Sequence, residues 1–163
     1  MMKTFFSTAM IGLLLLGVNV AQTKQPKLNQ VELNKQFIGS WKCTIAKDTT
    51  FFWEVKPYGI GFECSFKFVT KEKICAEGKQ LWGYDKKVDK CIISELFKGG
   101  DIMIYATWFS SNNKCEMLPS NEISNPEKAS LKVVSELKST DSFIQTTLVN
   151  NKPVKVDTYT RVK

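Results

Sequence analysis

From Phe37 to Lys163 the sequence is a succession of short runs rich in Phe, Ile, Val, Thr, Trp and Tyr. Turn residues separate the runs at intervals of about 8–12 residues, which is typical of a β-sandwich or a β-barrel. Apolar and polar residues alternate within the runs, as in a strand with one buried face. Ten such runs are present, at 37–46, 50–57, 60–69, 73–84, 90–98, 101–109, 113–119, 130–138, 142–149 and 153–162. The pattern predicts an all-β chain.

Tight-turn sequences connect neighbouring runs, which favours a meander of antiparallel strands. The clearest are Gly99-Gly100, Asn112-Asn113 and Asn150-Asn151. A ten-strand meander must protect its two edge strands, and closure into a ring does so. We therefore expect residues 37–163 to form an antiparallel up-and-down β-barrel of about 8–10 strands. Gly78 is expected to mark a bulge or bend.

Two further local features are expected outside the strands. Residues 125–129 (NPEKA) are expected to form one helical turn within a loop. Residues 22–36 are polar, Lys-rich and without periodicity, and we expect an N-terminal tail that ends in a helical turn.

The N-terminus has the build of a secretory signal peptide over residues 1–21. A basic start, Met1-Met2-Lys3, precedes an apolar core at 9–18, and Ala21 is a small residue suited to cleavage. A membrane-spanning helix needs about 20 apolar residues, so stable membrane insertion is not expected. No Cys follows the cleavage site, since the first is Cys43. These features predict a periplasmic or secreted protein.

Composition argues against several classes of function. The chain has no histidine, which removes the Ser–His–Asp triad, the Cys–His dyad and most zinc sites. Its net charge of +7 comes from dispersed lysines, with a single Arg, so nucleic-acid recognition is not expected. A catalytic acid would be a carboxylate in apolar surroundings, where its pKa is raised. Glu54, Glu63, Glu95 and Asp101 are instead assigned mostly to solvent-facing sides of strands. We therefore expect a protein without catalytic activity, without a cofactor and without a metal site.

The five cysteines contain no CxxC spacing, and at most two disulfides can form. A turn at Gly99-Gly100 pairs Cys91 with Trp108, and a turn at Ser111-Asn112 pairs Trp108 with Cys115. The two thiols would then lie two strand spacings apart, about 9.5 Å, beyond the ~7 Å that a disulfide spans. We predict that these two cysteines are not bonded to each other. Cys43, beside Trp41 on one face, is predicted to be a small buried hydrophobe.

Two residues, one in the first run and one in the last, form a pair that is also found in a known protein family. The first run contains Gly39-Ser40-Trp41, and the last contains Arg161, the one arginine among 23 basic residues. A guanidinium stacks on an indole and donates several hydrogen bonds, and the first and last strands of a closed barrel are neighbours. The pair resembles the calycin superfamily of lipocalins, fatty-acid-binding proteins and their bacterial relatives. There, Gly-x-Trp on the first strand meets an Arg on the last.

The resemblance implies a lipocalin-like barrel over residues 37–163, with Gly39, Trp41 and Arg161 closing one end. Gly83-Tyr84-Asp85 is also similar to an element of secreted lipocalin-like bacterial proteins. The chain departs from fatty-acid-binding proteins in lacking room for a two-helix lid after the first strand and in carrying Lys163 two positions after the Arg.

One internal conflict accompanies this resemblance. Simple alternation places Arg161 on the same side of its strand as Lys155, Asp157 and Tyr159. That side is interpreted as the polar, outward one, whereas a partner of Trp41 should face inward.

We therefore expect a protein that binds a small apolar or amphipathic molecule inside the barrel, where aromatic side chains would desolvate it. The alternative is a non-catalytic interaction module or inhibitor that has a filled core and uses a rim loop such as 119–129. Side-chain counting does not distinguish a hollow barrel from a solid one. The predicted ligand-binding residues are Phe66, Trp82, Tyr84, Tyr105, Trp108 and Phe143.

Overall fold

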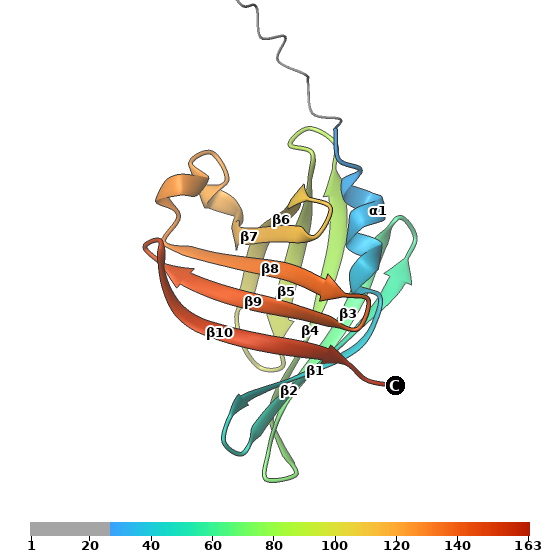
Figure 1. Ribbon diagram of the computed structural model, residues 1–163, viewed down its shortest axis with the longest axis vertical. Coiled ribbons are helices and arrows are strands. Elements are labelled where there is room, and N and C mark those ends of the chain that lie inside the picture. Colours follow the sequence, from blue (N-terminus) through green and yellow to red (C-terminus); the bar gives the residue numbers. More distant parts are fainter. Residues whose placement is uncertain (1–26) are drawn as a thin grey trace, which may run out of the picture.

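The chain forms a closed barrel of ten antiparallel strands, each next to its neighbours in sequence, with the first and last strands completing the ring (Figure 1). This computed structural model describes residues 27–163, so the predicted signal peptide lies outside the described residues. The predicted all-β, up-and-down barrel is confirmed. Among the described residues there is no helix long and apolar enough to cross a membrane.

The ten strands match the ten predicted runs, and their ends agree within two residues. They are β1 (Gly39–Ala46), β2 (Thr49–Tyr58), β3 (Gly61–Thr70), β4 (Lys73–Asp85), β5 (Lys90–Phe97), β6 (Ile102–Ser111), β7 (Lys114–Pro119), β8 (Leu131–Ser139), β9 (Ser142–Val149) and β10 (Lys152–Arg161). The helical elements are α1 (Gln30–Asn34) and the 3-10 turns η1 (Lys35–Phe37), η2 (Ser120–Glu122) and η3 (Pro126–Lys128). The last of these confirms the helical turn expected within 125–129.

Turn geometry accounts for a register that differs by one residue from the predicted one. Gly99 has φ +76°, and the connection between β5 and β6 is centred on it, because Leu96 pairs with Ile102. Cys91 therefore pairs with Thr107 and not with Trp108. A further shift between Phe109 and Ser111 leaves Phe109 opposite Cys115.

The bulge expected at Gly78 lies instead at Cys75. Phe68 pairs with Ala76 and Val69 with Ile74, so Cys75 is the extra residue on β4. Gly78 pairs in register and serves close packing. A Cβ there would stand 2.3 Å from Cζ of Phe66 and 2.5 Å from the carbonyl oxygen of Leu96.

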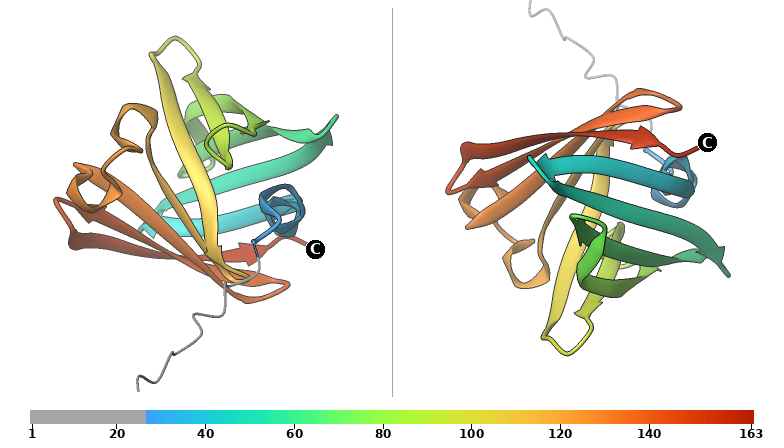
Figure 2. Two further views of the ribbon diagram at one scale, coloured as in Figure 1. Left: turned by 90° about the horizontal axis from the view of Figure 1, so that it is seen from above. Right: turned by 90° about the horizontal axis from the view of Figure 1, so that it is seen from below.

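The short helix α1 packs against one end of the barrel (Figure 2). The Gln30 amide donates to the Phe109 carbonyl (3.1 Å) and accepts from the Phe109 N–H (2.7 Å). Asn34 donates to the carbonyl of Gln30 and to the Cys91 sulfur. Residues 22–36 were predicted to form a tail that ends in a helical turn, and the described part of this segment contains the helix α1, which is fastened to β5 and β6. Polar residues are buried here because each one satisfies a backbone group or a thiol.

Replacing Gln30 with alanine is expected to lower the free energy of unfolding by about 2 kcal/mol, since both backbone groups of buried Phe109 lose their partner. Urea denaturation followed by fluorescence measures this change. The control is Gln36→Ala on the adjoining 3-10 turn, whose exposed side chain donates only to the Asn112 carbonyl. An equal loss in the two variants would contradict the assigned role of Gln30.

Candidate functional site

The barrel interior contains a cavity of about 280 Å³. The barrel is therefore hollow and not packed solid with side chains. Two walls of different chemistry face each other across the ring of strands. The wall from β2 to β5 is aromatic and contains Phe51, Trp53, Phe66, Phe68, Trp82 and Phe97. The wall from β8 to β10 is largely polar and contains Ser135, Gln145, Thr147, Lys155, Asp157 and Tyr159.

A chain of hydrogen bonds runs across the polar wall. The Tyr159 hydroxyl donates to the Gln145 carbonyl (3.1 Å), and the Gln145 amide donates to Ser135 (3.3 Å). Lys155 and Asp157 form an ion pair of 2.8 Å. The Lys155 side chain is 44% exposed and the Asp157 side chain only 9%, so the ammonium lies nearer the solvent. Every polar group of this wall except the threonine has a partner within the wall.

The aromatic wall contains a second polar network, built on Gln80 of β4. Its carbonyl oxygen accepts from the indole N–H of Trp82 (3.0 Å) and from that of Trp53 (3.3 Å). Its amide donates to a carboxylate oxygen of Glu95 at 2.5 Å. The two indole rings lie 5.7 Å apart at 34° to each other. Glu95 lines the cavity, in contrast to the solvent-facing position expected from the sequence.

Burial governs the ionisation of the groups around Glu95. The pKa of its carboxyl is raised, chiefly by desolvation, and the hydrogen bond from Gln80 opposes the rise. The pKa of Tyr105 is also raised, first by burial and then by the negative charge of Glu95. No ion pair among the described residues involves Glu95.

The inward face of β10 is the one interpreted from sequence as the polar, outward face. Asp157 and Tyr159 are buried, whereas Val154 and Val156 are 61% and 63% exposed. Trp41 pairs directly with Arg161, so the two share a side of the sheet without any bulge. The conflict noted in the sequence arose from assuming that the valines face the core. Because Arg161 lies on the inner side with Trp41, alternation along β10 also places Tyr159 and Asp157 on the inner side.

The structure places three of the six predicted ligand-binding residues in the cavity. Phe66, Trp82 and Phe143 line it. Tyr105 packs against the core beside Glu95 without lining the cavity, and its hydroxyl donates to the Met103 sulfur.

Tyr84 and Trp108 lie elsewhere, and their assignment to the site is corrected here. The Tyr84 hydroxyl donates to the carboxylate of Asp89 in the β4–β5 turn. Trp108 faces outward, because its neighbours Thr107 and Phe109 are the inward residues of β6, and the Lys90 ammonium lies 3.5 Å from its ring centre. In the observed register the buried Cys91 pairs with Thr107, so Thr107 and not Trp108 lies on the inner side of β6.

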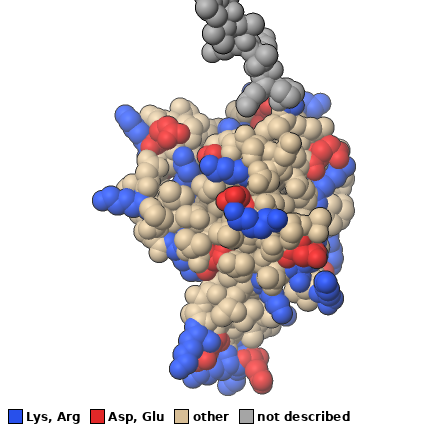
Figure 3. Space-filling model, viewed as in Figure 1, with Lys and Arg blue, Asp and Glu red and all other residues tan. Residues whose placement is uncertain are grey.

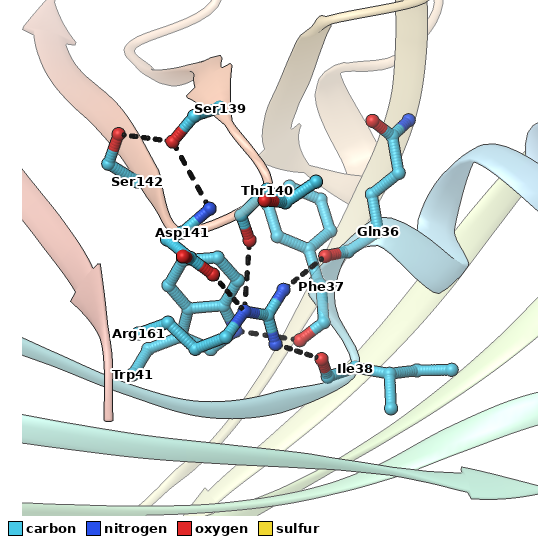
Figure 4. Close-up of polar contacts among 9 residues, drawn as sticks. All are labelled: Gln36, Phe37, Ile38, Trp41, Ser139, Thr140, Asp141, Ser142 and Arg161. Carbon is cyan, nitrogen blue, oxygen red and sulfur yellow. Dashed lines mark hydrogen bonds and ion pairs between the residues drawn. The ribbon is translucent and has the colours of Figure 1, made fainter. Parts of the chain in front are cut away.

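Arg161 joins three segments at the α1 end of the barrel (Figure 4). Its guanidinium lies over Trp41, with Cζ 4.2 Å from the ring centre. It donates to the carbonyls of Ile38 (2.5 Å) and Gln36 (3.3 Å) before β1, and to that of Thr140 (2.9 Å) in the β8–β9 turn. Trp41 is fully buried, and its indole N–H donates to the Phe37 carbonyl. The contacts are those of a structural clasp between the first and last strands, outside the cavity.

Gly39 makes the approach of Arg161 possible. Its φ is +122°, and a Cβ there would stand 2.2 Å from Nη1 of Arg161. A residue with a side chain would thus be strained in its backbone and would displace the guanidinium. The glycine of the Gly-x-Trp motif is therefore explained by its positive φ and by the room that it leaves for the arginine stacked on the indole.

A second hollow, of about 730 Å³, lies on the outer side of β1–β5. Apolar side chains there include Phe52, Leu96 and Val162, and charged ones include Lys67 and Glu77. Glu77 is paired with Lys98 at 2.6 Å, and the Lys67 ammonium lies over the Phe52 ring. Most of its charged groups are therefore satisfied by neighbours, unlike Glu95 in the interior.

The surface charges are mixed. Basic and acidic side chains alternate over the face shown in Figure 3 without forming a basic stripe. Exposed lysines pair with exposed carboxylates nearby, such as Lys79 with Glu63 at 2.8 Å and Lys98 with Glu77 at 2.6 Å. This distribution agrees with solvated strand faces.

The segment between β7 and β8 contains the rim loop 119–129 that an interaction module would use. This segment is fastened to the barrel. Ala129 is buried, and the Glu122 carboxylate accepts from both the N–H and the hydroxyl of Ser130. None of the large apolar side chains that are exposed among residues 27–163 lies in this segment. Beneath it, Ala106 and Leu118 are buried on the outer side of β6 and β7.

All five cysteines are free thiols, and four of them are buried. Cys91 and Cys115 lie on β5 and β7, with β6 between them, as predicted in kind though with a different register. Burial raises the pKa of Cys91 to about 11 and that of Cys115 to about 12, which makes both thiols poor nucleophiles. Cys43 is 2% exposed, which confirms the prediction of a buried hydrophobe.

The comparisons with known proteins add no family to this description. No protein-family model matches the sequence, and no curated protein sequence matches it either.

Proposed function

We propose that this protein is a lipocalin-like barrel that binds a small amphipathic molecule in its interior, without catalysis, in the periplasm or outside the cell. The observation that carries the proposal is the interior cavity with one aromatic and one polar wall. An apolar face of the ligand would replace water on the aromatic wall, and its polar groups would meet the wall from β8 to β10.

The size of the cavity limits the ligand. Ligand pockets commonly measure roughly 300–1,000 Å³, and the volume here is about 280 Å³. A single aromatic ring with a short polar substituent suits such a space better than a long acyl chain. The polar wall also disfavours a pure hydrocarbon, because the Thr147 hydroxyl would lose water without gaining a hydrogen-bond partner.

Filling the cavity provides the test. Ser135→Phe places a ring inside the barrel and is expected to lower ligand affinity by roughly 10- to 100-fold, since a ligand must displace a side chain whose burial is worth about 1.5–3 kcal/mol. Ser94→Phe is the matched control, because Ser94 is exposed on the outer side of β5. Both variants are first compared with the wild type by thermal denaturation.

Two measurements report the outcome. Native mass spectrometry of protein purified from its own host is expected to show a bound mass that denaturation releases and that Ser135→Phe lacks. Tryptophan fluorescence during titration with 2-phenylethanol and 2-phenylethylamine is expected to respond in the wild type and in Ser94→Phe. An empty protein that responds to none of these molecules would refute the proposal and favour a protein partner.

A further inference from the structure

The carboxylate of Glu95 is the charged group of the cavity without a charged partner. The Gln80 amide donates a hydrogen bond to one oxygen of this carboxylate, which therefore acts as an acceptor. Indole N–H groups can only donate, so the Gln80 oxygen must face Trp53 and Trp82, and its NH₂ must then face Glu95. Gln80 is the one hydrogen-bond partner of this carboxylate among the described residues, so the second carboxylate oxygen stays free to accept.

The surroundings of Glu95 suit a cation. Aromatic rings attract cations over their faces, most strongly when water is excluded, and Trp is the most effective. Trp53, Trp82 and Phe97 line the same cavity as the carboxylate. On the opposite wall Asp157 is already paired with Lys155. The cavity therefore holds two carboxylates and one ammonium, although the whole chain carries a net charge of +7.

We propose that the ligand is a small aromatic or aliphatic amine whose ammonium group binds the Glu95 carboxylate inside the aromatic-lined cavity. This inference rests on the proposed function and specifies the chemical class of its ligand. The Gln80 amide orients the carboxylate, and the ammonium donates to the free carboxylate oxygen. The apolar part of the amine lies among the phenyl rings of the aromatic wall.

Three nearly isosteric probes test the charge requirement: 2-phenylethylamine, 2-phenylethanol and 3-phenylpropanoate. Isothermal titration calorimetry at pH 7 is expected to show the amine binding about tenfold more tightly than the alcohol, or better, with the anion weakest. In Glu95→Gln the amine should lose this advantage, while the affinity for the alcohol stays within about twofold of the wild type. Gln is isosteric and still accepts from Gln80, so the cavity keeps its shape.

The matched control is Glu54→Gln. Glu54 lines the outer hollow and is paired with Lys56 at 2.9 Å, so its replacement should leave amine binding unchanged. A loss of amine binding in this variant would place the amine outside the barrel and overturn the inference.

The pH dependence provides a second readout. The ionised form of Glu95 binds the ammonium, so amine affinity should fall as the pH is lowered through the raised pKa of this carboxyl. Asp157 of β10 faces the same cavity with Lys155, and Tyr105 of β6 lies beside Glu95. The part of the pH dependence that disappears in Glu95→Gln belongs to Glu95. Identical pH profiles in the two proteins would contradict the inference.

The results separate this inference from the proposed function. Equal affinities for amine and alcohol, or an amine preference that survives in Glu95→Gln, would overturn the inference and leave the cavity as a binding site. Binding of none of the probes, together with an empty protein in native mass spectrometry, would overturn both.

Discussion

Replacing Arg161 with alanine is expected to lower the free energy of unfolding by about 3–4 kcal/mol and the melting temperature by about 10 °C. The variant leaves three backbone carbonyls without their charged donor and removes the cation from the Trp41 ring. The lost contacts hold together the seam of the barrel, which is the pairing between β1 and β10. This seam is short, since β1 and β10 pair at two positions, whereas β9 and β10 pair at eight.

Arg161→Lys separates charge from geometry. A lysine keeps the positive charge near Asp141, which lies 3.5 Å from Nε of Arg161, but it lacks the planar fork that reaches three carbonyls. We expect it to recover only about 1 kcal/mol of the loss. Urea denaturation with Lys42→Ala as a control, an exposed neighbour on β1, measures these differences. Full stability in Arg161→Lys would show that charge alone closes the seam.

Replacing Gly39 with alanine is expected to lower the free energy of unfolding by about 3 kcal/mol. The φ of +122° strains any residue with a Cβ, at about 1–3 kcal/mol. The new methyl group also meets Nη1 of Arg161, so the hydrogen bond to Ile38 must break or lengthen. Gly83→Ala is the matched control, because a Cβ there meets no atom within 4 Å and its φ is ordinary. We expect that control to change stability by less than about 0.5 kcal/mol.

A double-mutant cycle distinguishes the two causes. In the Arg161→Ala background the clash with the guanidinium is absent, so Gly39→Ala should cost only its backbone strain. The expected coupling between the two sites is about 1–2 kcal/mol. Strict additivity would mean that Gly39 is required for its backbone conformation alone and not to make room for the arginine.

The strands and the clasp could be predicted from the sequence, because both depend on local or paired signals. Alternation within each run reflects a two-residue period, and the runs therefore coincide with β1 to β10. Arg161 is the one arginine in a sequence that otherwise uses lysine, and this indicated that it is the partner of Trp41. The turn at Asn150-Asn151 was recognised because both residues tolerate the positive φ of 50° and 61° that a tight hairpin requires.

The binding site depended on details that alternation cannot supply. A one-residue change in register moves every side chain of a strand to the other face. In β6 the turn centred on Gly99 pairs the buried Cys91 with Thr107, so Thr107 and not Trp108 lines the cavity. Tyr84 and Tyr105 lie outside the cavity for another reason, because their hydroxyls bond to Asp89 and Met103.

The sequence alone predicted an antiparallel up-and-down barrel of about 8–10 strands, since strand period and turn chemistry are local properties. The pairing of Arg161 with Trp41 followed from the chemistry of the two side chains and from the neighbouring positions of the first and last strands. Only the tertiary structure decided what the barrel contains. The exposed valines of β10 and the interior position of Asp157 and Glu95 reverse the usual preference of apolar residues for the inside. That reversal is stable because Lys155 pairs with Asp157 and Gln80 bonds to Glu95, contacts that form only once the strands have closed.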